Sequence, residues 1–449
     1  MAFSQSKTAC SAAAFLLAIV LLGGCNRPET ETALVEPRPA VEFKPAVESK
    51  KASQPPVAKV KEPTVGVLEL NPADVDDHPL SIAASHQQAT GDWPLFRGDQ
   101  EGSGVARTTL PANDELEVLW EYKVKGRDGA FESSPIVVRN QSNGRPTVYA
   151  ADLDGKIYSI DLQTGQWNWK FQAGISIEAS PAYKDGHIYI GDLDGNFFCL
   201  KENGGLVWSK ELEVPITGAA NFHGGNVVFG TDDASLYCLN CKDGKEVWKF
   251  SAADQIQCSI TVSDGTAFVA GCDGQFRMID LDDGTERGSV PMGSPTGCTP
   301  AVAQGYAVVG TEQAEFVCVD LKDVKLKWGF ADEDGASPIR GSAAIKGQQV
   351  FFGARNRQVY SVNLKTGEQE WTVTLKGRVD GSPVVVGDRM FVGAGDGRLY
   401  ALSLDGEIQW TKQLNGPVNN SPAAAFEKLV IATDRGVVYC LGKKKDVQE

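Results

Sequence analysis

The 449-residue chain is poor in histidine and in positive charge, and both shortages exclude kinds of function. Of its four histidines only His187 and His223 lie beyond residue 90, and neither stands beside a nucleophile motif, so no Ser/His/Asp hydrolase site is expected. The glycine-rich fingerprints of P-loop and dinucleotide-binding enzymes are missing. A formal net charge of −15 excludes nucleic acid as an expected partner, because nucleic-acid binding needs a concentrated basic face.

Cysteine is present, but not in a metal-binding pattern. Eight cysteines remain beyond Cys10 and Cys25, and four of them occupy one repeat column, where we expect small buried side chains. The pair Cys238 and Cys241 forms a lone CxxC, and no second pair of ligands follows at zinc-site spacing. We therefore expect no metal site in this sequence.

The N-terminus has the layout of a signal peptide. Lys7 precedes an uncharged stretch, Ala12–Leu22, that is too short to span a bilayer comfortably as a permanent helix. The ending Leu22-Gly-Gly-Cys25 resembles the bacterial lipobox, which implies a signal peptide over 1–24 and lipidation of Cys25. By the same resemblance, Asn26 in place of Asp implies the outer membrane, facing the periplasm. The alternative is ordinary secretion with an incidental cysteine.

The next segment, 25–90, is rich in proline and has few aromatic residues and no sustained hydrophobic period. Nine prolines are spread through it among Glu, Lys, Ala and Val. Such a segment buries too little apolar surface to offset the entropy cost of ordering it. We predict a disordered tether behind the lipidated cysteine.

A repeat occupies residues 115–442. Each copy has a small residue, then Ser-Pro or a variant, and short β-type runs separated by Gly/Asp turns. The Ser-equivalent positions are Ser134, Ser180, Ala219, Ser259, Thr299, Ser342, Ser382 and Ser421. Their spacings of 46, 39, 40, 40, 43, 40 and 39 residues match a four-stranded propeller blade. The sequence therefore predicts an all-β, eight-bladed β-propeller of four-stranded antiparallel blades.

Tryptophans form a second ladder with the same period, interrupted near Gly288. Its members are Trp120, Trp169, Trp208, Trp248, Trp328, Trp371 and Trp410. We expect each indole to wedge between neighbouring blades. Trp120 precedes the first Ser-Pro, and the last repeat ends without a Trp, so the strand around Trp120 is predicted to close the last blade.

Three repeats carry a finer pattern: a small residue, Asp or Asn, Thr-Gly or Asp-Gly, and a terminal Trp. They are Ser159–Trp169, Cys238–Trp248 and Ser361–Trp371. This pattern resembles the tryptophan-docking motif of pyrroloquinoline-quinone (PQQ) dehydrogenases and of the BamB-like outer-membrane lipoprotein family. Repeat five departs from it, with Asp323-Val324 where glycine is expected. The segment 91–114 resembles the lead-in of such proteins and is predicted to pack on the ring, and 443–449 is a C-terminal tail.

Two sets of residues are candidates for a site. The column two residues before each Ser begins the innermost strands, and we expect it to ring the mouth of the central channel as a recognition site. Its members are Glu132, Glu178, Thr217, Gln257, Gly297, Arg340, Asp380 and Asn419. The loops with Asp152, Asp154, Asp192 and Asp194 are expected on the same face. Solvated channel lining and ordinary Asp-Gly turns are the alternatives, and calcium binding by the loops is a third.

Two functions remain open at this point. The resemblance implies a non-catalytic, lipid-anchored and monomeric scaffold without a cofactor, which binds protein partners of the β-barrel assembly machinery at the cell envelope. The alternative is a quinoprotein, dehydrogenase or sensor, that binds PQQ with calcium. The adjacent Cys-Cys pair of many PQQ alcohol dehydrogenases is absent, and the repeats leave no long insertion to cover a cofactor. The scaffold is therefore the favoured prediction.

Overall fold

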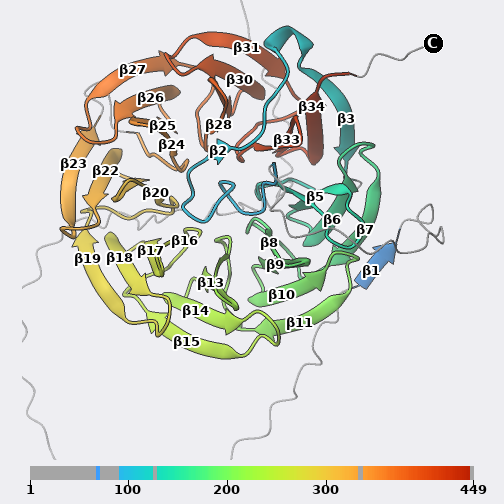
Figure 1. The fold of residues 1–449 in the computed structure, drawn as a ribbon, viewed down its shortest axis with the longest axis horizontal. Helices are drawn as coiled ribbons and strands as arrows, with labels where there is room; N and C mark the ends of the chain where they lie inside the picture. Colours follow the sequence, from blue (N-terminus) through green and yellow to red (C-terminus); the bar gives the residue numbers. More distant parts are fainter. Residues whose placement is uncertain (1–66, 71–90, 125–128, 332–336, 445–449) are drawn as a thin grey trace, which may run out of the picture. The chain divides into compact units, whose positions relative to one another are not determined.

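The computed structural model describes residues 67–70, 91–124, 129–331 and 337–444. Within these ranges the chain forms eight four-stranded antiparallel sheets arranged around a central channel (Figure 1). The prediction of an all-β, eight-bladed propeller is confirmed. The described residues contain a single turn of 3₁₀ helix, Asn113–Glu115, and no helix able to cross a membrane. Cys25, Asn26 and most of the predicted tether lie outside the described residues.

The blades follow one another along the chain, each with its first strand nearest the channel. Blade 1 contains β4 (Ile136–Arg139), β5 (Pro146–Ala151), β6 (Lys156–Asp161) and β7 (Trp167–Gln172). Blade 2 contains β8 (Ala182–Lys184), β9 (His187–Gly191), β10 (Asn196–Lys201) and β11 (Leu206–Glu211). Blade 3 contains β12 (Asn221–His223), β13 (Asn226–Gly230), β14 (Ser235–Asn240) and β15 (Glu246–Ser251). Blade 4 contains β16 (Thr261–Ser263), β17 (Thr266–Ala270), β18 (Gln275–Asp280) and β19 (Glu286–Pro291).

The second half of the ring repeats this order. Blade 5 contains β20 (Ala301–Ala303), β21 (Tyr306–Gly310), β22 (Glu315–Asp320) and β23 (Lys325–Ala331). Blade 6 contains β24 (Ala344–Lys346), β25 (Gln349–Gly353), β26 (Gln358–Asn363) and β27 (Gln369–Thr374). Blade 7 contains β28 (Val384–Val386), β29 (Arg389–Gly393), β30 (Arg398–Ser403) and β31 (Ile408–Gln413). Blade 8 contains β32 (Ala423–Ala425), β33 (Lys428–Thr433) and β34 (Val437–Gly442).

The fourth strand of blade 8 comes from the start of the repeat region. Strand β3 (Glu117–Lys123) pairs antiparallel with β34, and Trp120 lies opposite Cys440. This is the closure predicted from the position of Trp120. It joins the two ends of the repeat region in one sheet and supplies the outer strand that blade 8 would otherwise lack.

Two further strands join blades from outside the repeat. The short strand β2 (Val105–Ala106) pairs parallel with β28, and β1 (Val67–Leu70) pairs antiparallel with the outer strand β7. Strand β1 lies inside the range predicted to be a disordered tether, so at these four residues the structure differs from that prediction.

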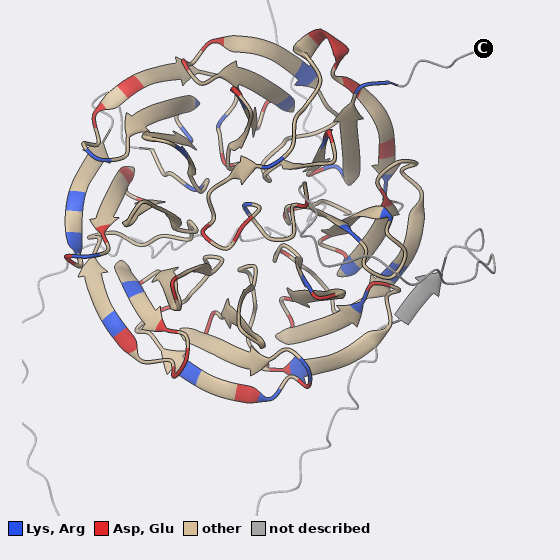
Figure 2. Cartoon of the chain, viewed as in Figure 1, with Lys and Arg blue, Asp and Glu red and all other residues tan. Residues whose placement is uncertain are grey.

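Burial along the strands explains why some strands of the repeat are continuously apolar and others alternate between polar and apolar residues. The middle strands, such as β13 and β29, are buried on both faces because each blade packs between two neighbours. The outer strands alternate, as in β31, where exposed polar residues alternate with partly buried ones at the rim. Charged residues of both signs lie along these outer strands (Figure 2).

At six of the eight junctions, an indole of the tryptophan ladder docks one blade onto the next through a hydrogen bond. The indole Nε1 of Trp120 donates to the Leu162 carbonyl at 2.9 Å, and Trp169 donates to the Glu202 carbonyl at 2.7 Å. Four more indoles repeat this bond to the following blade: Trp208, Trp248, Trp328 and Trp371. The ring packs against a turn glycine of that blade: a Cβ added to Gly165 would lie 2.6 Å from Trp120. Glycine is therefore required there for close approach as well as for its positive φ.

The two departures from the repeat meet at one junction, between blades 4 and 5. Gly288 stands in the tryptophan position, and Val324 stands in the position of the turn glycine that an indole would cover. A Cβ built on Gly288 would lie 2.9 Å from a Val324 methyl carbon. The valine side chain thus occupies part of the space left by the missing indole.

The Ser column forms a belt of hydrogen bonds around the channel. The backbone N–H of Ser134 donates to Ser180 Oγ at 2.9 Å, and that of Ser421 donates to Ser134 Oγ at 3.0 Å. Five other junctions have the same bond, from Ala219, Ser259, Thr299, Ser342 and Ser382 to the hydroxyl of the next blade. The belt is interrupted between blades 2 and 3, because Ala219 has no hydroxyl to accept the N–H of Ser180.

The lead-in segment passes once around the inside of the ring, next to the belt of Ser hydroxyls. In most blades the backbone N–H of the residue three places after the Ser donates to a carbonyl of this segment: Val137 donates to the Trp93 carbonyl and Tyr183 donates to that of Pro94. The same donation recurs in blades 4 to 7 from Val262, Val302, Ile345 and Val385. In blades 3 and 8 side chains make the contact, from Asn221 to the Gln100 carbonyl and from the Glu427 N–H to Thr108. The segment therefore crosses one end of the channel (Figure 1).

The broken belt gives a stability prediction. The substitution Ala219→Ser supplies the missing acceptor, and one added buried hydrogen bond should raise the free energy of unfolding by about 1 kcal/mol. Removing an existing acceptor with Ser382→Ala should lower it by about 1–2 kcal/mol, because the Ser342 N–H is left unpaired. Urea unfolding measures both. If neither Ala219→Ser nor Ser382→Ala changes the free energy of unfolding, the belt contributes nothing to the stability of the ring.

Candidate functional site

The channel ends in a small polar cavity, which we call the cup. It encloses about 180 Å³ and is lined by Phe96 of the lead-in segment, by the Ser column and by the column two residues before it. Along each first strand the order is ring residue, Ser, and then the residue bonded to the lead-in. The lead-in therefore forms the floor of the cup, and the ring residues surround its mouth.

The structure brings the predicted ring together. All seven predicted residues line the cup, and Gly297 completes the circle in blade 5. They are Glu132, Glu178, Thr217, Gln257, Arg340, Asp380 and Asn419. Their role in recognition stays a prediction.

A second circle of side chains, missed by the sequence analysis, comes from the loops between the second and third strands. Asp232 accepts a hydrogen bond from Gln257 Nε2 at 3.4 Å, and Asp434 accepts one from Asn419 Nδ2 at 2.6 Å. Glu312 and Arg355 occupy the same loop position in blades 5 and 6. The available signal was the register: these residues stand one place after the first Asp of the Asp-Leu-Asp-Gly loops. Their types vary from blade to blade, which hid the column.

One side of the cup is acidic. Glu132, Glu178, Asp232 and Asp434, which we call the acidic half, come from blades 1, 2, 3 and 8, which are neighbours in the ring. None of the four forms an ion pair within the described part of the chain. Burial, helped by the charges of Glu132 and Asp232, raises the pKa of Glu178 to about 7. Burial likewise raises the pKa of Asp434 to about 6, and it raises those of Glu132 and Asp232.

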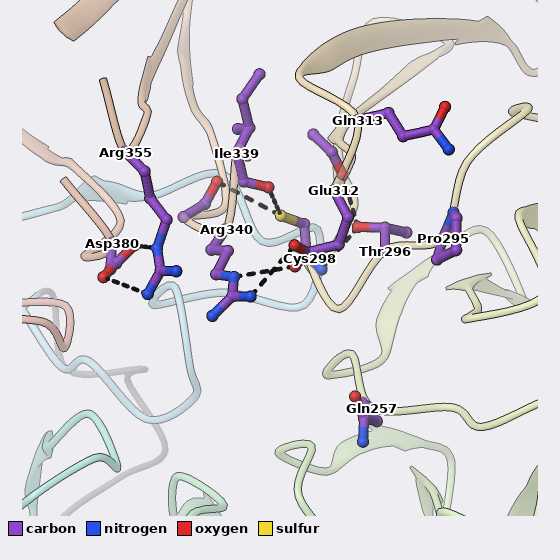
Figure 3. Close-up of polar contacts among 12 residues, drawn as sticks. Gln257, Pro295, Thr296, Cys298, Glu312, Gln313, Ile339, Arg340, Arg355 and Asp380 are labelled. Atoms are coloured by element: carbon purple, nitrogen blue, oxygen red, sulfur yellow. Dashed lines mark hydrogen bonds and ion pairs between the residues drawn. The ribbon is translucent and has the colours of Figure 1, made fainter. Parts of the chain in front are cut away.

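The other side of the cup is neutralised by ion pairs, shown in Figure 3. Arg340 contacts both carboxylate oxygens of Glu312, at 3.0 and 3.3 Å. Arg355 contacts both oxygens of Asp380, at 2.7 and 3.3 Å, and Arg378 contacts Asp380 at 2.7 Å. These five residues, the paired half, come from blades 5 to 7. The cup is thus polarised across its width, with uncompensated negative charge on one side.

The predicted Asp loops make turn and blade contacts. Asp152 is fully buried and accepts hydrogen bonds from the Lys156 N–H at 2.9 Å and from the Tyr158 hydroxyl at 2.6 Å. Asp192 accepts from Asn196 in the same way. Asp194 accepts from the Ile175 N–H, and Asp154 lies 3.8 Å from Lys156. Among the described residues no group of three or more His, Cys, Asp and Glu side chains is arranged to hold a metal ion.

The cysteines of the repeat column are packing groups. Cys199, Cys238, Cys318 and Cys440, the column of predicted fillers, are fully buried, and burial raises the pKa of each to about 12. The Cys298 thiol, just before the first strand of blade 5, donates to the Ile339 carbonyl (Figure 3), and burial also raises its pKa to about 12. Thiols with such pKa values are poor nucleophiles at neutral pH.

Fold and cup together define a tryptophan-docked, eight-bladed propeller of the PQQ-like class. The family model described as outer membrane protein assembly factor BamB matches residues 200–328 and 331–445, and the chain belongs to this family. Among its relatives is the outer membrane protein assembly factor BamB of Salmonella typhimurium, 24% identical over 330 residues, which are 70% of this chain and 74% of the relative. That of Burkholderia pseudomallei is 23% identical, over 65% of this chain and 78% of the relative.

Solved structures show the same fold at lower identity. BamB from Moraxella catarrhalis superposes with a TM-score of 0.62 at 18% identity, covering 74% of this chain and 99% of that one. Quinohemoprotein alcohol dehydrogenase from Comamonas testosteroni superposes with a TM-score of 0.68 at 15% identity, covering 80% and 82% of the two chains. At these identities the likeness defines the fold and leaves the function to be argued from the site.

Within the described residues, the cup offers no unpaired cationic side chain to PQQ that carries no calcium. The cofactor is a polycarboxylate, but Arg340 and Arg355 are already engaged in two-point contacts with Glu312 and Asp380. The opposite side of the cup is acidic and would repel PQQ in the absence of a bound cation. The volume of about 180 Å³ also lies below the roughly 300–1,000 Å³ of most small-molecule sites.

The raised pKa of Glu178 predicts a pH-dependent stability. Because its pKa is near 7 in the folded state and about 4.5 when unperturbed, the folded chain holds this proton more tightly, so stability is lost as pH rises through 7. Glu178→Gln removes that loss and should raise the free energy of unfolding at pH 8 by about 2 kcal/mol, with little effect at pH 4.5. Unfolding at the two pH values measures the difference.

The matched control is Glu246→Gln, which removes one exposed carboxylate from the outer strand β15. It should change stability by less than about 0.5 kcal/mol at either pH. Equal effects of the two substitutions at pH 8 would refute a strained carboxylate at the mouth of the cup.

Proposed function

We propose that this protein is a non-catalytic docking scaffold that takes part in outer-membrane protein assembly at the cell envelope. The family match over residues 200–328 and 331–445 carries the proposal. The shape supports it, because blade strands of three to seven residues joined by short loops give a rigid ring suited to presenting a fixed surface. A lipid anchor on Cys25, outer-membrane attachment facing the periplasm and a monomeric propeller belong to the same proposal.

The face around the mouth of the cup is the favoured docking surface. Among the large hydrophobic side chains in the described residues, Ile175 is the most exposed, at 76%. It lies in the loop between β7 and β8, the same loop that carries Glu178 to the mouth of the cup. An exposed aliphatic side chain beside a polar, charged ring has the character of an interface anchor with a hydrated surround.

Co-purification from solubilised envelopes of the native host tests the docking surface. Full-length tagged protein should recover a β-barrel assembly subunit, identified by mass spectrometry. Ile175→Asp should lower its recovery at least about fivefold, because a charge replaces the anchor. Val247→Asp is the control: Val247 is 48% exposed but lies on the outer strand β15, away from the mouth, and recovery should not change. Repeated failure to recover any assembly subunit would refute the scaffold proposal.

The quinoprotein alternative rests on the structural likeness to quinohemoprotein alcohol dehydrogenase. Titration of the purified protein with PQQ and calcium, followed by absorbance and calorimetry, decides between the two. The scaffold proposal predicts no saturable binding. Saturable binding that is lost in Glu178→Ala or Asn419→Ala would overturn it and would favour a quinone site at the cup.

A further inference from the structure

We propose that the acidic half of the cup is a binding site for an organic primary ammonium group, such as the end of an alkyl diamine or of a lysine side chain. The inference rests on the cup alone and stands or falls independently of the proposed scaffold function. The negative charge of Glu132, Glu178, Asp232 and Asp434 is one support for the proposal. Buried hydrogen-bond acceptors without partners on residues of the same side of the cup are a second.

The acidic half has hydrogen-bond acceptors that no donor satisfies. Asn420 lines the cup and is 4% exposed; its Nδ2 donates to the Phe131 carbonyl at 3.2 Å, whereas its Oδ1 has no partner. Within the described ranges, Asn419 Oδ1 and Asp434 Oδ1 are also buried without a partner. The Thr217 hydroxyl lies close enough to Asp232 to lower the pKa of that carboxyl, so this pair is not counted among them. Unsatisfied buried polar atoms are rare in folded proteins and call for a partner.

These unpartnered atoms select the chemistry of the ligand. All three are amide carbonyl or carboxylate oxygens, which can only accept when the carboxyl is ionised. An ammonium group offers three N–H donors and no acceptor, so it is the complement of such a surface. A ligand with its own carboxylates, such as a quinone cofactor, would add acceptors and negative charge where both are already in excess.

A metal ion is the less suitable cation for this site. The described residues contain no group of three or more His, Cys, Asp and Glu side chains placed to share one ion. Phe96 on the floor supplies an aromatic surface, which attracts an organic cation through the π system and gives its alkyl chain an apolar contact. A volume of about 180 Å³ is roughly that of six water molecules in the liquid, enough for a short alkylammonium chain.

The paired half orients the ligand. Arg340 and Arg355 hold their positive charges away from the acidic half, so a cation is drawn to one side of the cup. Arg378 lies nearer to Asp434, whose pKa it lowers. The geometry thus predicts a fixed polarity, with the ammonium group at blades 8, 1, 2 and 3.

Affinity should rise with pH. The carboxyls of Glu178 and Asp434, with pKa values of about 7 and about 6, are partly protonated at pH 5.5 and ionised at pH 8. Glu178 faces Glu132 and Asp232, while Asp434 faces Glu132, Asp380 and Arg378. A bound cation lowers the repulsion among the carboxylates, so it should bind at least about tenfold more tightly at pH 8 than at pH 5.5.

Calorimetric titration of the purified full chain with 1,5-diaminopentane at pH 8 tests the proposal. We expect saturable binding to one site. A second titration with N-acetyl-lysine methylamide separates the sources: tighter binding of this probe assigns the site to a lysine side chain of a protein, and tighter binding of the diamine assigns it to a free amine. Both results support the ammonium site. A calcium chloride titration is run in parallel.

Variants locate the site. Glu178→Gln should weaken diamine binding at least about tenfold at pH 8, because it removes a carboxylate from the site. Glu132→Gln, which removes the neighbouring carboxylate of the acidic half, is the second variant if Glu178→Gln does not fold, and a loss of about threefold is expected. Glu246→Gln on the outer strand should bind as the wild type does. Absence of saturable binding by both ammonium probes, binding of calcium in their place, or unchanged binding in both cup variants would overturn the proposal.

Discussion

The structure depends on the hydrogen bonding of the eight inner strand edges. In a propeller each blade turns the edge of its first strand toward the channel, and buried backbone N–H groups there need acceptors. Two levels of contact supply them in this protein: the belt of Ser and Thr hydroxyls, and the carbonyls of the lead-in segment. The second level has a geometric consequence, because a chain that passes around the channel also closes it. The cup therefore exists because the lead-in segment, inside the channel, accepts hydrogen bonds from the inner strand edges.

The mouth of the cup behaves differently from the blade interior. The interior of the blades pairs its polar groups and docks its indoles with regular geometry. In the acidic half, by contrast, four carboxylates have no ion-pair partner among the described residues and some buried oxygens have no hydrogen bond. Such an arrangement costs stability, and proteins retain costs of this kind mainly where function requires them. The paired half, built from the same positions of neighbouring blades, shows that this fold can neutralise the ring. The contrast between the two halves is therefore informative about the site.

Repetition made the fold predictable from sequence, and departures from repetition limited the prediction of the site. The Ser spacing and Trp120 were sufficient for the blade count and the closing strand, because both follow from local pattern. Gly288 and Val324 were visible as separate anomalies, but their contact joins neighbouring blades and requires coordinates. Asp232 and Asp434 were missed because their column holds a different residue type in almost every blade. A varied column has no motif, although in this protein it carries the charge pattern of the cup.

Hydrogen–deuterium exchange of the full chain tests the central claim, that the lead-in segment pairs with the inner strand edges and closes the channel. The decisive amides are those of Tyr183, Val262, Val302, Ile345 and Val385, which donate to lead-in carbonyls. If the account is correct, they exchange as slowly as amides in the middle strands β13 and β29, because both open only with the blade. Exchange at the rate of exposed loop amides would contradict the account and leave the channel open at both ends.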